Sequence, residues 1–213
     1  MTLRIVIADD HPLIRGGVRM LLKDRRDLSV VAEAHSTDTL LSVLKETPAD
    51  LLITDFSMPG GQASDGLGLL QRLRRDFPDL PIVVLTMMAN VGVHSSMLEV
   101  GVRGLVDKAS DISEVVMAID AVSGGREYVS AAFRKGLFEN PNKINYGAST
   151  QLSLREVEVL RLFASGLTVS AISERLARSI KTVSTQKTVA MLKLGLKNDY
   201  DIFVYAREHG MNA

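Results

Sequence analysis

The sequence predicts two domains, an α/β domain with an open parallel sheet followed by an all-helical domain. Short apolar runs alternate with longer stretches of helical spacing five times in the first part of the chain. After residue 150 every plausible element has helical spacing. A length of 213 residues is enough for two modest domains, each with its own core.

Five strands are expected in the first domain, and each is a short run of β-branched or other apolar residues. They cover residues 3–8, 28–34, 50–54, 81–86 and 104–107. The stretches that follow them repeat apolar residues on one helix face. Because the strands are apolar along their whole length, helices should cover both faces of the sheet. We expect a parallel sheet with strand order 2-1-3-4-5.

The domain boundaries follow from a change in sequence character. We expect the first domain over residues 1–125, a linker over 126–149 with a short helix at 131–138, and the helical domain over 150–213. An irregular extension of the first domain is the alternative for residues 126–149. In the last domain we expect four helices, over residues 153–165, 168–177, 181–194 and 199–209. Ser153 and Glu156 form a capping box that begins the first of these helices.

Composition excludes several kinds of site and favours two different partners. The chain has no cysteine, which excludes disulfides and thiolate metal sites. The net charge of zero combines −3 in residues 1–149 with +3 in residues 150–213. The sequence shows no signal peptide and no apolar run of about 20 residues that could cross a membrane, so we expect a cytoplasmic protein without a membrane partner.

Polar side chains stand where the expected strands end. Asp9 and Asp10 follow the first strand, Asp55 follows the third, Thr86 ends the fourth and Lys108 follows the fifth. The carboxyl ends of parallel strands share one edge, so these groups should meet there. Crowded carboxylates require a cation, and Mg²⁺ prefers such oxygen ligands.

This arrangement is typical of phosphoryl chemistry. Asp55 is the candidate nucleophile that accepts the phosphoryl group, while Lys108 and Thr86 offer a positive charge and a hydroxyl donor. Any one of these residues alone is better explained as a turn former or a helix cap. The combination at four strand ends is what favours the functional interpretation.

Two groups of motifs resemble a known family. IADDHP, DFSMPG, VLTM and VDK are similar to the signature positions of receiver domains in two-component response regulators. The segment LSLREVEVLRLFASG and the segment RSIKTVSTQKTVAMLKLG resemble the LuxR-type helix-turn-helix of the NarL/FixJ group. Together the two resemblances cover nearly the whole chain. They imply a flavodoxin-like (βα)5 receiver domain followed by a four-helix DNA-binding domain.

The resemblance implies a role for each pocket residue. Asp55 would be phosphorylated by a histidine kinase or a histidine phosphotransfer protein. Asp10 and Asp55 would ligate Mg²⁺ together with the backbone carbonyl of Ser57, and Asp9 would act at or near the ion through water. Thr86 would hydrogen-bond the phosphoryl group and Lys108 would pair with it. Their movement would shift the face formed by the fourth helix, fifth strand and fifth helix.

Two positions depart from the family pattern. Leu105 stands where relatives often carry an aromatic residue that rotates on activation, and Ala109 stands where many carry proline. An aromatic switch is therefore in doubt and a cis-proline is excluded. The signal would instead pass through residues 87–92 or through dimer contacts.

The helical domain has helix-turn-helix spacing, with residues 181–194 as the helix that enters the major groove. Its start should contact phosphates through Lys181 and Thr182, and Lys193 should contact another. Its polar faces should reach base edges, and the candidates are Ser184, Thr185, Lys187 and Thr188. A small helical bundle with a solvated polar face is the structural alternative.

The leading interpretation is a transcription regulator that is controlled by phosphorylation. A modest positive charge suggests that DNA is bound by two copies. These would form a homodimer, and the family resemblance also leaves open a heterodimer with another regulator. A phosphate-independent regulator that keeps the receiver fold is the second reading. An aspartyl-phosphate hydrolase is the third, and Ser57 argues against it because such enzymes commonly carry aspartate there. We therefore expect a transcription regulator rather than an enzyme.

Overall fold

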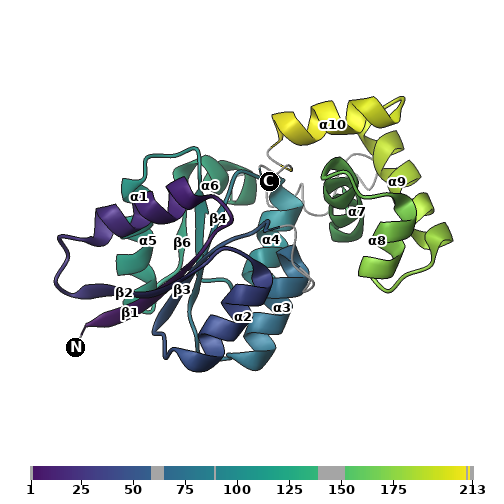
Figure 1. The fold of residues 1–213 in the computed structure, drawn as a ribbon. Helices are drawn as coiled ribbons and strands as arrows, with labels where there is room; N and C mark the ends of the chain where they lie inside the picture. The colour runs from purple at the N-terminus through teal and green to yellow at the C-terminus, as the bar shows by residue number, and fades with distance from the viewer. Residues whose placement is uncertain (1, 59–64, 89, 139–151, 210, 212–213) are drawn as a thin grey trace. The chain divides into compact units, whose positions relative to one another are not determined.

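The computed structural model describes residues 2–58, 65–88, 90–138, 152–209 and 211 (Figure 1). Residues 59–64, residue 89 and the expected linker from residue 139 onward lie outside the described residues. The chain divides into two compact units, one formed by Met1–Met87 with Met97–Arg134 and the other by Met88–Ser96 with Lys135–Ala213.

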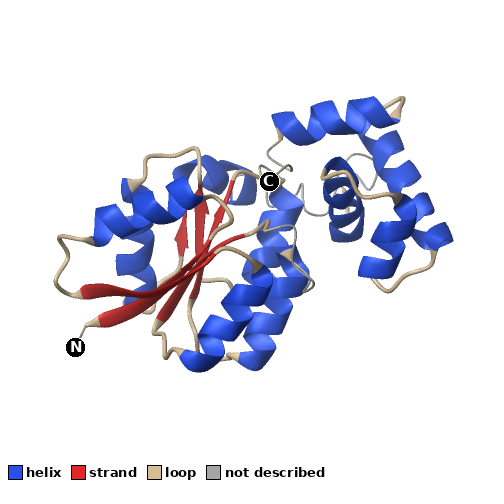
Figure 2. Cartoon of the chain, viewed as in Figure 1, coloured by secondary structure: helices blue, strands red, loops and turns tan. Residues whose placement is uncertain are grey.

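The first unit contains a six-stranded parallel sheet with strand order β2-β1-β3-β4-β5-β6 (Figure 2). The strands are β1 (Leu3–Ala8), β2 (Leu28–Ala34), β3 (Leu51–Asp55), β4 (Ile82–Thr86), β5 (Gly104–Asp107) and β6 (Tyr128–Val129). The predicted order of the first five strands is confirmed. The sixth strand lies in the expected linker, so the sheet continues past the boundary placed at residue 125.

Helices alternate with the strands, as the periodicity predicts. They are α1 (Pro12–Leu22), α2 (Thr37–Glu46), α3 (Gly66–Asp76), α4 (Val91–Glu99), α5 (Ser113–Ser123) and α6 (Ala131–Phe138). The last of these confirms the short helix expected at residues 131–138. Figure 1 shows α1 and α5 on one face of the sheet and α2 and α3 on the other.

The strands are buried because both faces are covered. Ile5, Ile7, Leu51 and Ile53 are fully buried and pack with α1 and α5. Gly104 is required by a close approach of neighbouring strands, because a Cβ there would lie 2.7 Å from Cγ2 of Val83. The rigid sheet fixes the strand ends from which the candidate site is built.

The four expected helices of the C-terminal region are confirmed. They are α7 (Leu154–Ala164), α8 (Val169–Arg175), α9 (Ile180–Leu194) and α10 (Asp199–Glu208). A side-chain cap begins each one, from Ser153, Thr168, Ser179 and Asn198. Val159, Leu162, Ile172 and Val183 form a buried cluster that joins α7, α8 and α9. Among the described residues, no helix combines the length and the apolar character needed to cross a bilayer.

Candidate functional site

The predicted acidic pocket is assembled at the carboxyl edge of the sheet. Asp9 follows β1, Asp55 ends β3 and Lys108 follows β5. The Lys108 ammonium lies 2.8 Å from Oδ2 of Asp9 and 2.6 Å from Oδ2 of Asp55. Exposed fractions of these three side chains are only 8%, 0% and 7%, respectively. A buried ammonium therefore bridges two carboxylates that are 46 residues apart in sequence.

Oxygen and nitrogen ligands gather beside this bridge. One ligand atom from each of Asp9, Asp10, His11 and Asp55 lies within 4.8 Å of the others. The His11 Nδ1 atom is 2.8 Å from Oδ1 of Asp10 and 3.2 Å from Oδ1 of Asp9. This set is rich in carboxylate oxygens and fits a hard divalent cation such as Mg²⁺. His11 was not among the predicted residues, although it directly follows the acidic pair.

The remaining predicted pocket residues flank the bridge. The Ser57 N–H donates to Oδ1 of Asp55 at 3.2 Å, which orients the candidate nucleophile. Thr86 ends β4 and is 2% exposed, and its carbonyl accepts the Lys108 N–H at 3.0 Å. The structure thus brings Asp9, Asp55, Thr86 and Lys108 to one small region, as the strand-end pattern predicts.

The electrostatics of the pocket favour an additional cation. Burial, together with the neighbouring charge of Asp9, raises the pKa of Asp55 to about 6, although the Lys108 charge opposes the rise. Burial lowers the pKa of Lys108, but the charges of Asp55 and Asp9 outweigh burial and hold its pKa above the usual value. One ammonium does not offset all the nearby carboxylates, because Asp9, Asp10 and Asp55 together carry three negative charges when ionised.

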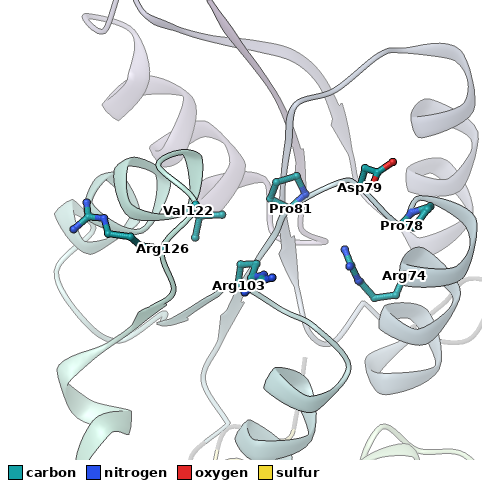
Figure 3. Close-up of a pocket in the computed structure, with 8 residues that line it drawn as sticks. Arg74, Pro78, Asp79, Pro81, Arg103, Val122 and Arg126 are labelled. Atoms are coloured by element: carbon teal, nitrogen blue, oxygen red, sulfur yellow. The ribbon is translucent and has the colours of Figure 1, made fainter.

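A second hollow lies elsewhere on this unit and has a different character. It has a volume of about 220 Å³ and is lined by Arg74, Pro78, Asp79, Pro81, Arg103, Val122, Gly125 and Arg126 (Figure 3). Arg103 directly precedes β5, so this pocket lies where strands begin rather than where they end. The described residues that line it include none of the predicted site residues.

The face of α9 that is predicted to read DNA is exposed. Val183 and Ala190 are fully buried and attach the helix to its domain. The residues on the other side are exposed, namely Lys181, Thr182, Ser184, Thr185 and Thr188. Ser179 caps the helix by accepting the Thr182 N–H at 3.0 Å. Thr185 and Thr188 donate to helix carbonyls, at 2.9 Å and 3.0 Å, and keep acceptor capacity for another contact.

Two lysines among the predicted DNA contacts, Lys187 and Lys193, pair with carboxylates of the helical domain in this structure. The Lys187 ammonium lies 2.6 Å from Oδ1 of Asp199 and 3.8 Å from the ring centroid of Phe163. The Lys193 ammonium lies 2.8 Å and 3.0 Å from the two carboxylate oxygens of Glu156. Both lysine side chains are mostly buried. The Lys187 ion pair joins α9 to α10, and the Lys193 ion pair joins α9 to α7. Periodicity places a lysine on a helix face but does not show where its long side chain ends.

α10 buries part of its apolar face. Ile202 and Ala206 are fully buried, and Phe203 packs against Phe163 at a ring distance of 5.8 Å. Tyr200 and Phe203 remain exposed, at 73% and 38%. Only this smaller surface of the described helix is available to a partner.

Removing the Lys193 charge should destabilise the helical domain. Glu156 accepts the Ser153 N–H at 2.7 Å and also pairs with Lys193, so it joins the start of α7 to α9. Lys193→Ala leaves this buried carboxylate without its cation and should cost about 1–3 kcal/mol of unfolding free energy at neutral pH. We expect thermal unfolding to detect the loss, with the exposed Lys197→Ala as the matched control.

The contribution of the Lys193–Glu156 pair to folding stability should depend on pH. Burial raises the pKa of Glu156, but the Lys193 and Ser153 hydrogen bonds outweigh it, so the pKa lies below its usual value. A carboxyl whose pKa is depressed on folding stabilises the protein above its unfolded pKa and loses this contribution as the pH falls. The Lys193→Ala penalty should therefore be smaller at about pH 3 than at about pH 7. An equal penalty at both values would contradict the ion pair.

The comparisons with known proteins agree with both halves of the molecule. The family model for the response regulator receiver domain matches residues 5–120, and the model for bacterial regulatory proteins of the luxR family matches residues 150–206. Transcriptional regulatory protein RcsB of Salmonella typhi is 39% identical over 203 residues, which cover 95% of this chain and 93% of the relative. Oxygen regulatory protein NreC of Staphylococcus epidermidis is 35% identical, with 96% of each chain covered.

Solved structures of RcsB are also similar to this chain. RcsB from Salmonella enterica serovar Typhimurium, bound to promoter rprA in the presence of the phosphomimetic BeF₃⁻, matches with a TM-score of 0.82 and 38% sequence identity. The match covers 97% of this chain and 99% of that chain. The chain therefore belongs to the response regulators that join a receiver domain to a LuxR-type regulatory domain.

Proposed function

We propose that the chain regulates transcription by binding DNA through α9, under the control of a phosphoryl group on Asp55. The observation that carries the proposal is the buried Lys108 bridge between Asp9 and Asp55 at the carboxyl edge of the sheet. The exposed, hydroxyl-rich face of α9 supports the DNA-binding part. In this proposal residues 1–125 receive the phosphoryl group and residues 150–213 bind DNA.

Each pocket residue has a part in the transfer. An oxygen of Asp55 attacks the phosphorus of a phosphohistidine on a histidine kinase or a histidine phosphotransfer protein, and the histidine leaves. Lys108 offsets the charge on the transferring oxygens, and the Thr86 hydroxyl donates to one of them. Asp9, Asp10 and Asp55, with the Ser57 carbonyl, would hold Mg²⁺, which supplies further charge neutralisation.

The assembly that binds DNA is proposed to be a dimer. The helical region carries only +3 net charge, and two copies on paired half-sites increase both affinity and specificity. Solved RcsB structures include two dimers bound to two parallel DNAs. A homodimer is the simplest assembly, and a heterodimer with another regulator uses the same domains. We place the protein in the cytoplasm, where its DNA lies.

Substitutions on α9 should separate phosphate contact from base contact. Lys181→Ala should weaken binding on all sequences and reduce the salt slope by about 1, because one phosphate contact is lost. Thr185→Ala should instead change base preference at one position by about 1 kcal/mol. Binding is measured at several salt concentrations on selected and random DNA, with Lys197→Ala as the control. If both variants match the wild type, α9 does not read the DNA.

A further inference from the structure

Ser130 lies where β5, β6 and α6 meet. It is not one of the residues of the acidic pocket. It follows β6, precedes α6 and is fully buried. Its N–H donates to the Leu105 carbonyl at 2.8 Å, and this bond continues the pairing of β6 with β5. Its carbonyl accepts the N–H groups of Phe133 and Arg134, at 3.0 Å and 3.1 Å, and so begins α6.

The Ser130 hydroxyl replaces a main-chain group in the sheet. In a parallel ladder, the bond after Ser130 N–H to Leu105 would run from the Asp107 N–H to the Ser130 carbonyl. That carbonyl is used by the first turn of α6, and the Asp107 N–H donates to Oγ of Ser130 at 3.2 Å instead. The side chain therefore holds the last residue of β5 to the residue that begins α6.

Glu114, in the first turn of α5, fixes this hydroxyl. Oγ of Ser130 donates to Oε2 of Glu114, so the hydroxyl both donates and accepts. Tyr128 also hydrogen-bonds Glu114, and burial, the Glu114 charge and this hydrogen bond raise the pKa of Tyr128. Arg134 donates from Nε to the Val129 carbonyl at 2.7 Å, which ties the first turn of α6 back to β6. These contacts make the junction a defined connection.

The junction is one residue from the phosphoryl pocket. Asp107 precedes Lys108, whose N–H donates to the Thr86 carbonyl on the neighbouring strand at 3.0 Å. A phosphoryl group on Asp55 adds negative charge directly beside the Lys108 ammonium and attracts it. Displacement of the Asp107 backbone changes the bond from its N–H to Oγ of Ser130, and Ser130 holds the first turn of α6. Leu105 cannot act as the aromatic switch, so this route supplies a different connection.

We infer that Ser130, held by Glu114, is a positioning residue that couples the Lys108 end of β5 to the first turn of α6. This inference rests on the proposed function. Through this residue, a structural change caused by phosphorylation of Asp55 would pass from β5 to α6, which precedes the helical domain in sequence.

Hydrogen exchange at the amides of Phe133 and Arg134 tests the coupling in the full-length protein. Exchange is measured with and without Mg²⁺ and a small phosphodonor, after mass spectrometry has shown equal phosphorylation. In the wild type, phosphorylation should change the exchange rate of these amides by at least about threefold. In Ser130→Ala, the rates should be faster in both states and differ between them by less than about 1.5-fold.

Three further variants make the test specific. Ser123→Ala removes an exposed hydroxyl from α5 and should keep the wild-type response. Glu114→Ala should reduce the response, and Glu114→Gln, which keeps an acceptor for Ser130, should restore most of it. These two variants carry the test if Ser130→Ala does not fold.

The outcomes separate the two proposals. If Ser130→Ala, or Glu114→Ala in its place, is phosphorylated and shows the wild-type response, the coupling is overturned while the proposed function stands. If the wild type is phosphorylated without any change at Phe133 and Arg134, the coupling is also overturned. If the wild type takes up no phosphoryl group, both proposals fail.

Discussion

Asp55→Asn should take up no phosphoryl group from a small phosphodonor, and its DNA affinity should not respond to the donor. Asparagine has nearly the shape of aspartate, but its amide is not a nucleophile at neutral pH. The side chain is buried beside Lys108, and its Oδ1 position can still accept the Ser57 N–H, so the fold should be kept. Intact mass and a DNA-binding titration, each with and without donor, measure the effect.

The control for Asp55→Asn is Asp79→Asn, which changes an exposed aspartate outside the acidic pocket. It should take up phosphoryl groups and respond to the donor as the wild type does. If Asp55→Asn binds DNA with the affinity of the phosphorylated wild type, the protein is a regulator that works without phosphate. If Asp55→Asn still becomes phosphorylated, the acceptor is another residue.

Lys108→Ala should slow phosphoryl uptake about 10²–10³-fold at saturating Mg²⁺, because a preorganised positive charge beside the transferring oxygens is lost. The substitution also leaves the buried Asp9 and Asp55 carboxylates without the ammonium that lies 2.8 Å and 2.6 Å from them. Their mutual repulsion is then offset only by a bound cation. Folding stability should therefore depend more strongly on Mg²⁺ in the variant than in the wild type.

Rates of uptake and thermal unfolding, each over a Mg²⁺ titration, measure both effects of Lys108→Ala. Lys45→Ala, on the exposed side of α2, is the matched control and should leave uptake and Mg²⁺ dependence unchanged. An uptake rate in Lys108→Ala within about threefold of the wild-type rate would show that the ammonium does not assist the transfer.

The acidic pocket was predictable because sheet topology converts sequence position into proximity. Alternation of strands and helices fixes a parallel sheet, and parallel strands end at one edge. Asp9, Asp55 and Lys108 therefore had to meet, although no local pattern shows the ammonium between the two carboxylates. The proximity of His11 to the carboxylates could be recognised only in the structure, because a histidine after an acidic pair is as compatible with a helix start as with a ligand.

Other features depended on tertiary contacts that periodicity does not encode. The strand β6 has only two residues, too few for an alternation signal, and the Ser130 hydroxyl completes its pairing. On α9 Val183 is buried, as its apolar side chain favours, but the positions of the Lys187 and Lys193 ammonium groups depend on carboxylates of other helices. Long flexible side chains can reach partners several residues away from their own helix face.

Location of the phosphoryl group in the wild type tests the central claim most directly. The protein is incubated with a small phosphodonor, with Mg²⁺ or with a chelator, and the acyl phosphate is trapped by borohydride reduction before peptide mass mapping. We expect one modified residue, Asp55, and modification only when Mg²⁺ is present. Modification at another residue, or equal uptake in the chelator, would contradict it.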